Sequence, residues 1–162
     1  MSPTVVSTLV VVACMKRVEL RAGVDPLTGD VIPDPASAGP SPADTAALEW
    51  ALRIAEASGG AVVAAVTAGG PECDAMLRAA LAAGAMRAVR VPVGDTAGEA
   101  PSTVVARALA RAVAFVVAPP TPATPAAATG MSGVVVCCGD ASVDRGSGSV
   151  PSAASTIWGS CG

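Results

Sequence analysis

The sequence predicts an α/β fold with three layers, in which a mostly parallel sheet is covered by helices on both faces. Short valine-rich runs alternate along the chain with longer alanine-rich segments of helical periodicity. The valine-rich runs are almost continuously apolar, which is typical of strands that are buried on both faces. Right-handed crossovers through the intervening helices would make these strands parallel. The 162 residues suffice for one domain with a buried core.

The first third of the chain is predicted to hold a central strand, a long connection and a helix. Residues 5–15 (VVSTLVVVACM) form the strand because most of them are apolar and β-branched. In residues 21–43, a regular helix is excluded by Pro33, Pro35, Pro40 and Pro42, and so long an irregular segment is often functional. A helix follows over residues 44–57, with Asp44 as a plausible N-cap and two glycines after its end.

The middle of the chain continues the alternation of strands and helices. Residues 61–66 and 88–93 are predicted strands, and residues 73–83 between them form a helix. Pro92 favours an edge position for the second of these strands, because proline cannot donate to a sheet ladder. A third helix is expected over residues 101–114.

The last part of the chain combines an insertion, a strand and a glycine-rich turn. Residues 116–130 are rich in proline and alanine and are predicted to be an insertion without regular structure. A buried strand is expected over residues 133–138, followed by a turn over residues 144–149 (DRGSGS). The nucleotide-binding α/β domain would then span residues 1–151, with a short tail over residues 152–162.

Composition excludes several classes of function. The net charge of −3 and a pI near 4.8, without a basic run, argue against nucleic-acid binding. The apolar runs are too short to span a bilayer, and no basic segment precedes the first of them, so we expect a cytoplasmic protein. The absence of histidine excludes a Ser–His or Cys–His nucleophile pair.

Five cysteines occur without a CxxC spacing, which indicates neither a disulfide framework nor a zinc site. Cys14, Cys137 and Cys138 lie in predicted strands, and we expect them to be small buried apolar groups.

The glycine-rich turn after the last strand is the candidate binding site. In open α/β sheets a ligand binds beyond the carboxyl ends of the strands. Gly146 and Gly148 would let backbone N–H groups approach a phosphate closely, and Ser147 and Ser149 would add hydroxyl donors. An ordinary surface turn is the alternative interpretation.

Five stretches of the sequence, in the same order, resemble motifs of the β subunit of electron transfer flavoprotein. They are residues 14–18 (CMKRV), 25–29 (DPLTG), 41–52 (SPADTAALEWAL), 67–70 with 77–85 (TAGG and LRAALAAGA), and 138–150 (CGDASVDRGSGSV). The last stretch also resembles the divergent branch of the family that is associated with mycofactocin systems. The resemblance ends near residue 151, so it implies a C-terminally shortened subunit.

The resemblance implies an electron carrier rather than an enzyme, with a Rossmann-like fold of the adenine nucleotide alpha hydrolase type. An FAD-binding α subunit would be its partner, and AMP would be its own structural ligand, replaced in some members by a second FAD. Electrons would arrive from flavin dehydrogenases and leave towards a quinone reductase of the respiratory chain.

The resemblance also implies which residues line the AMP pocket. They are Ala13, Cys14, Ser41, Thr67, Ala68, Asp140, Asp144, Gly146, Ser147, Gly148 and Ser149. Two of them depart from the family pattern: Ser41 stands where asparagine is usual, and Ser149 where glutamine is frequent.

Two other interpretations remain open from the residues. A small adenine-nucleotide-binding regulatory protein of the universal-stress type has the same general architecture. Its phosphate motif, G-x-x-G followed after nine residues by G-[ST], fails here because Gly146 follows Gly133 only after twelve. A non-functional fragment is the other interpretation.

Overall fold

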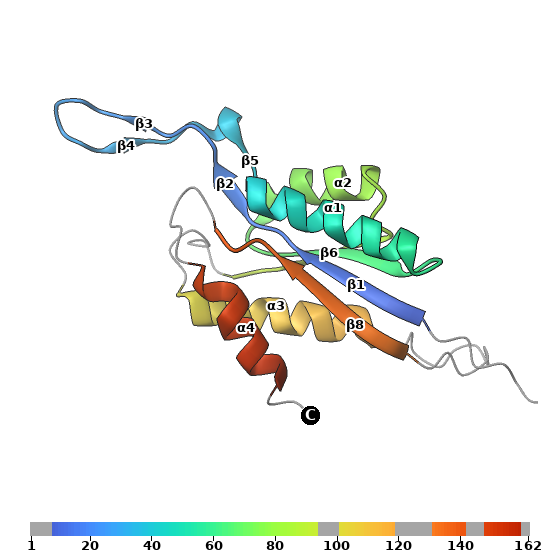
Figure 1. The fold of residues 1–162 in the computed structure, drawn as a ribbon. Coiled ribbons are helices and arrows are strands. Elements are labelled where there is room, and N and C mark those ends of the chain that lie inside the picture. The colour runs from blue at the N-terminus through green and yellow to red at the C-terminus, as the bar shows by residue number, and fades with distance from the viewer. Residues whose placement is uncertain (1–7, 94–100, 119–130, 142–147, 160–162) are drawn as a thin grey trace, which may run out of the picture.

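A parallel sheet forms the centre of the molecule (Figure 1). The computed structural model describes residues 8–93, 101–118, 131–141 and 148–159. Within these residues the sheet has four strands in the order β7-β6-β1-β8, and every neighbouring pair is parallel. The strands are β1 (Thr8–Cys14), β6 (Val62–Ala68), β7 (Arg87–Val91) and β8 (Met131–Cys138). The predicted parallel sheet, the central first strand and the edge position of β7 are thus confirmed.

Helices cover both faces of this sheet, which confirms the three-layer prediction (Figure 1). The helices α1 (Pro42–Ala57) and α2 (Asp74–Ala82) pack on one face. The helices α3 (Ser102–Val117) and α4 (Ser149–Gly159) lie on the other. None of the helices in the described part of the chain is long and apolar enough to cross a membrane.

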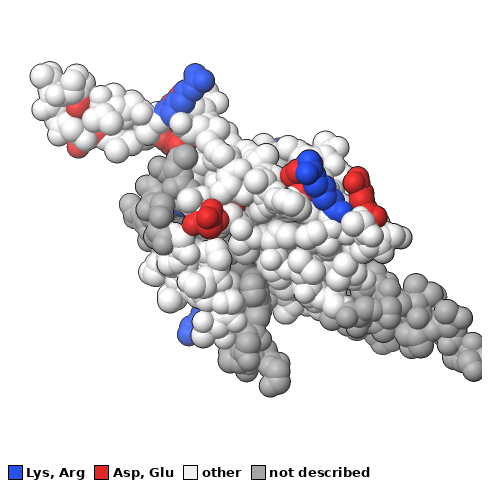
Figure 2. All heavy atoms as spheres, in the orientation of Figure 1, with Lys and Arg blue, Asp and Glu red and all other residues white. Residues whose placement is uncertain are grey.

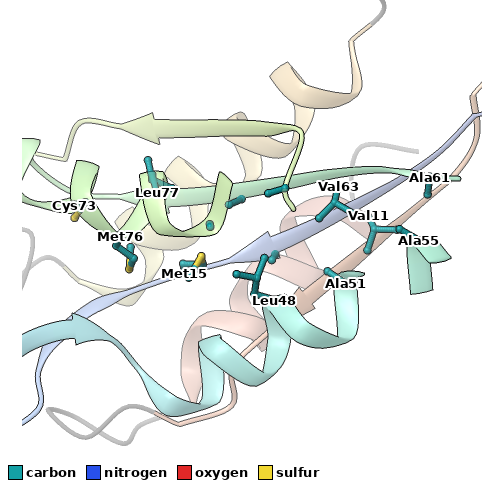
Figure 3. Close-up of a cluster of buried hydrophobic side chains, with 14 residues drawn as sticks. Val11, Met15, Leu48, Ala51, Ala55, Ala61, Val63, Cys73, Met76 and Leu77 are labelled. Atoms are coloured by element: carbon teal, nitrogen blue, oxygen red, sulfur yellow. The ribbon is translucent and has the colours of Figure 1, made fainter. Parts of the chain in front are cut away.

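Alternating residues of β1 divide the core into two clusters. Val11 and Ala13 face α1 and α2, whereas Val10 and Val12 face α3. Figure 3 shows the first cluster, in which Leu48 and Ala51 of α1 lie against the sheet beside Val11 and Met15. Alanines at the contact let the helix backbone approach the strands closely, which explains a core that is nearly free of aromatic residues.

The connection between β1 and α1 is not structureless, contrary to the prediction for residues 21–43. Strand β2 (Arg17–Glu19) pairs antiparallel with β5 (Ala38–Pro40), and β3 (Gly23–Val24) with β4 (Val31–Ile32). Strands of two or three residues carry no readable periodicity, so the sequence does not indicate them. The pair β3 and β4, with its connecting loop, forms an arm that projects from the body (Figure 1).

A turn over residues 25–29 (DPLTG) closes this arm. The carboxylate oxygen Oδ1 of Asp25 accepts a hydrogen bond from the Leu27 N–H at 2.8 Å, and Gly29 has a φ of +76°. This is the local Asx turn that aspartate side chains form with the backbone two residues on. A short 3₁₀ turn, η1 (Pro35–Ser37), then leads back to the body.

The ends of two helices differ from prediction. Helix α1 begins at Pro42 with Ser41 as its N-cap residue, so the interpretation of Asp44 as the N-cap is wrong. Proline at the first helical position is favourable because its missing N–H would have no partner there. Helix α3 continues to Val117, where an insertion was expected from residue 116, because Val116 is buried against the second cluster. Residues 119–130 of that expected insertion lie outside the described residues.

Other elements match their predictions within one to three residues. Helix α2 follows a 3₁₀ turn, η2 (Pro71–Cys73), and β6 extends two residues beyond the expected strand. The predicted tail over residues 152–162 is helical where it is described, because α4 begins at Ser149 and includes Pro151. Ala154 of this helix is fully buried, so the segment is part of the packed structure.

Candidate functional site at the carboxyl edge of the sheet

The strand order predicts a binding crevice between the carboxyl ends of β1 and β8. The chain proceeds from β1 outward through β6 to β7 and then returns to the other side of β1 as β8. In open α/β sheets, the loops that leave the carboxyl ends of two such neighbouring strands run in opposite directions. Ligands bind between these two loops. The register aligns Cys14 with Cys138, so both strands end at the same level.

The N-terminus of α1 joins the two loops that leave these strands. Asp44 is only 7% exposed, and both of its carboxylate oxygens accept backbone hydrogen bonds. Oδ2 accepts from the Lys16 N–H at 2.9 Å, and Oδ1 accepts from the Gly139 N–H at 3.2 Å. One carboxylate therefore fixes the backbone after β1 and the backbone after β8 at the same time.

Ser41 makes the same connection from the end of the helix. Its N–H donates to the Lys16 carbonyl at 3.1 Å, and its hydroxyl donates to the Ala141 carbonyl at 3.2 Å. Ser41 is fully buried, and its own carbonyl accepts from Thr45 within α1. Since the hydroxyl is already engaged with the loop after β8, we read Ser41 as a residue that positions this loop.

Gly139 is required at its position by the close approach of α1. A Cβ atom there would lie 2.5 Å from Oδ1 of Asp44 and 3.0 Å from the backbone carbon of Ala43. Any other residue would push the loop after β8 away from the helix.

Asp44 was not among the predicted site residues, although the sequence holds a signal for it. Asp44 lies three, four, seven and eleven residues before Ala47, Leu48, Ala51 and Ala55, which form the buried face of α1. This helical spacing places Asp44 on the same buried face. A carboxylate in the buried stripe of an amphipathic helix needs partners, because an unpaired buried charge is costly. The two backbone groups that donate to it are 28 and 95 residues away in the chain, and the sequence does not reveal them.

Thr67 carries a buried hydroxyl at the carboxyl end of β6. The residue is 0% exposed, and its Oγ1 has no hydrogen-bond partner among the described residues. The thiolate of Cys73 would accept from this hydroxyl, but burial and the nearby Glu72 charge raise the pKa of Cys73, which keeps it a thiol at neutral pH. An unpaired buried hydroxyl costs stability and calls for a specific explanation, of which a missing ligand is one.

The end of the glycine-rich turn lies against the loop after β8. Gly148 has a φ of +56°, and a Cβ atom on it would lie 2.8 Å from the Asp140 carbonyl oxygen. Ser149 opens α4, and its hydroxyl donates to the Ser102 hydroxyl of α3 at 2.9 Å. Backbone N–H groups at the start of a helix bind anions favourably, and in α4 Val150 and Ser152 can offer such groups, whereas Pro151 has no N–H.

The structure brings some of the predicted pocket residues together. Cys14, Ser41 and Asp140 lie on the segments that bound the crevice, and Gly148 contacts the last of these segments. Ala13 does not reach the edge, because its side chain is fully buried in the core below α1.

The remaining predicted pocket residues lie away from the crevice, or they are not among the residues that the structure describes. Thr67 and Ala68 end the neighbouring strand β6, and Ala68 faces the second cluster. Asp144, Gly146 and Ser147 lie outside the described residues. In the part of the chain that is described, no group of three His, Cys, Asp or Glu side chains gathers as a metal site would need.

Comparison with models of protein families identifies a family. A family model described as "Electron transfer flavoprotein domain" matches residues 31–133, which is more than half of the chain. The matched part includes α1, β6, α2, β7 and α3. No curated protein matches the chain.

Proposed function

Because the chain belongs to the electron transfer flavoprotein family, we propose that it is a β-type subunit that binds AMP as a structural ligand at the carboxyl edge of its sheet. Proteins of this family carry electrons. In this proposal an α-type subunit holds the FAD that accepts and donates electrons. Flavin dehydrogenases supply the electrons and a quinone reductase receives them.

The observation that carries the nucleotide proposal is the unpaired, fully buried hydroxyl of Thr67. It lies at the carboxyl end of β6, on the other side of β1 from the crevice, so an adenylate that reaches it would extend from the crevice across the end of β1. A ribose hydroxyl or an adenine nitrogen would give this group a partner. Other groups at this edge would suit the rest of the nucleotide. The backbone at the strand ends offers donors and acceptors to adenine, and the N-terminus of α4 offers N–H groups to a phosphate.

AMP and FAD share the adenylate group, and both satisfy these donors and acceptors. When bound, the adenylate supplies no chemistry, but it fills the crevice and links β1, β6 and β8. A ligand that binds only the folded chain adds to its stability by mass action. The bound nucleotide thus acts as part of the folded structure.

The exposed apolar side chains of the projecting arm support the proposal of a partner subunit. Leu27 at its tip is 94% exposed, and Val24, Val31 and Ile32 are all more than half exposed. Figure 2 shows that the arm is mostly uncharged. Exposed apolar side chains that cluster in this way mark interaction sites, because they gain free energy when a partner removes them from water.

Release of the bound nucleotide from the purified full-length chain tests the proposal. The chain is denatured, and the supernatant is analysed by mass spectrometry. We expect AMP in near-stoichiometric amount, or FAD if the chain belongs to the members with a second flavin. ATP would instead indicate the universal-stress type of function, and the absence of any adenine nucleotide would contradict the proposal.

Co-expression with the gene of a flavin-binding α subunit tests the second part. We expect the two chains to purify together in equal amounts with bound FAD. Replacing Leu27 and Ile32 by serine should weaken this association, whereas replacing the exposed Phe115 on α3 by serine should not. Equal recovery of the partner with all variants would contradict a role of the arm.

A further inference from the structure

Two cysteines face each other at the carboxyl ends of the central strands. Cys14 ends β1, Cys138 ends β8, and the parallel register pairs them directly. Adjacent strands lie about 4.8 Å apart, which is within the separation of about 4.4–6.8 Å between Cα atoms that disulfides require.

Both side chains point to the same face of the sheet. Cys14 belongs to the cluster below α3, and Cys138 packs against that cluster. Cys137 points to the opposite face, towards α1, although it precedes Cys138 directly in the chain. The sheet therefore selects Cys138, and not its neighbour, as the partner of Cys14.

The two thiols differ in access and in acidity. Cys14 is 5% exposed, whereas Cys138 is partly exposed. A hydrogen bond joins the two side chains, and this bond raises the pKa of Cys14 well above its usual value and lowers the pKa of Cys138. The proton therefore stays on the buried sulfur, and the thiolate forms on the accessible one. Thiol–disulfide exchange needs an accessible thiolate to attack and a second thiol within reach to complete the reaction.

We propose that Cys14 and Cys138 are a redox-active dithiol, which a small-molecule disulfide such as oxidised glutathione converts into an intramolecular disulfide. In the first step the Cys138 thiolate attacks one sulfur of the small disulfide, forms a mixed disulfide and releases one thiolate. Cys14 then loses its proton and attacks the Cys138 sulfur, so the second small thiolate leaves. The two protein thiols are oxidised, and one small disulfide is reduced to two thiols.

The new bond would join β1 to β8 directly beside the residues that define the crevice. Gly139, which follows Cys138, is held by Asp44, so the disulfide would form next to an already anchored loop. Formation of this disulfide needs no nucleotide in the crevice. The inference about the two cysteines is therefore independent of whether AMP binds there.

Peptide mapping of the full-length chain tests this inference. The folded protein is equilibrated in glutathione buffers from fully reduced to fully oxidised, alkylated and digested with trypsin, which separates residues 1–16 from residues 112–145. We expect a disulfide between these two peptides to become the main form as the buffer becomes oxidising. A chain that keeps both thiols in the most oxidising buffer would overturn the inference.

Cysteine variants identify the two sulfur atoms that form the disulfide. The cross-link should persist in Cys137→Ser, which is the matched control, and disappear in Cys138→Ser. In Cys14→Ser a single glutathione adduct should accumulate on Cys138, whereas Cys14 should not form an adduct in Cys138→Ser under the same conditions. A link through Cys137 or Cys161 would refute the assignment. Where a variant fails to fold, fragmentation of the cross-linked wild-type peptides in the mass spectrometer between Cys137 and Cys138 identifies the sulfur.

Discussion

At the residue scale, Asp44 connects the two halves of the candidate site. Its two oxygens accept hydrogen bonds from the Lys16 and Gly139 N–H groups, and hydrogen bonds to a carboxylate are stronger than those between neutral groups. Replacement by alanine would leave two backbone donors without partners. We expect Asp44→Ala to lower the free energy of unfolding in urea by about 3 kcal/mol.

Two variants make this prediction specific. Asp44→Asn should lower the free energy of unfolding by less than Asp44→Ala, because the amide oxygen still accepts a hydrogen bond from one N–H. Glu56→Ala, on the exposed face of the same helix, should change the free energy of unfolding by less than about 0.5 kcal/mol. Equal losses for Asp44→Ala and Glu56→Ala would show that the carboxylate does not join the two loops.

Thr67 allows stability and binding to be separated. Thr67→Val keeps the shape of the side chain but removes the unpaired hydroxyl, so the nucleotide-free chain should gain about 1 kcal/mol in free energy of unfolding. The same change should weaken AMP binding in calorimetry about tenfold, by loss of one hydrogen bond. Thr67→Ser retains the hydroxyl and should bind like the wild type. Unchanged affinity of the valine variant would place the hydroxyl outside the nucleotide site.

The acidity of Cys138 is open to direct measurement. The thiolate is the form that iodoacetamide alkylates, so a lowered pKa moves the rise in rate to lower pH. We expect the midpoint for Cys138 to lie below that for Cys137, because burial and the neighbouring Cys138 charge raise the pKa of Cys137. Cys14→Ala removes the hydrogen bond and should move the Cys138 midpoint upward. Mass spectrometry of each site gives the two rates, and coinciding midpoints would contradict the hydrogen-bonded pair.

At the scale of elements, the packing of α1 against the loop after β8 depends on Gly139. The Cβ atom of Gly139→Ala would collide with the backbone of the helix, and we expect a loss of about 2 kcal/mol in free energy of unfolding. Gly133→Ala, within the preceding strand β8, is the control, since its Cβ would meet only Leu9 at 3.6 Å. Thermal unfolding of both variants provides the measurement. A loss at Gly133 as large as that at Gly139 would mean that strand propensity, not helix approach, decides the effect.

The elements themselves were largely predictable from the sequence. Helical periodicity locates α1, and continuous apolar runs locate β1, β6 and β8, because burial on one or two faces leaves a pattern in the residues. The ladders of β2 with β5 and of β3 with β4 were not predictable, since strands of two or three residues are too short to show a periodicity. The end of α3 was missed because its last apolar residues run directly into a proline-rich stretch.

The candidate site was predictable only in part. The carboxyl edge of the sheet follows from the alternation of strands and helices, and a family resemblance pointed to Ser41 and Thr67. Periodicity cannot show that the Ser41 hydroxyl bonds to a carbonyl 100 residues away, nor that the Thr67 hydroxyl lacks a partner. Such facts depend on how distant segments meet, and only the folded chain contains them.

At the scale of the whole molecule, the strand order decides where the chain can bind. The order β7-β6-β1-β8 opens the crevice between β1 and β8, and α1 closes it from one side. The projecting arm lies away from the helices of both layers, so a partner can cover it without blocking the packed core (Figure 1).

An AMP titration of the ¹⁵N-labelled chain, followed by amide chemical shifts, tests the central claim most directly. The account predicts that the amides of Lys16, Thr67, Gly139 and Gly148 shift with a common dissociation constant, whereas those of Leu9, Val62 and Gly133 at the opposite edge of the sheet do not. Shifts confined to the opposite edge, or no shifts at all in a chain freed of its nucleotide, would contradict it.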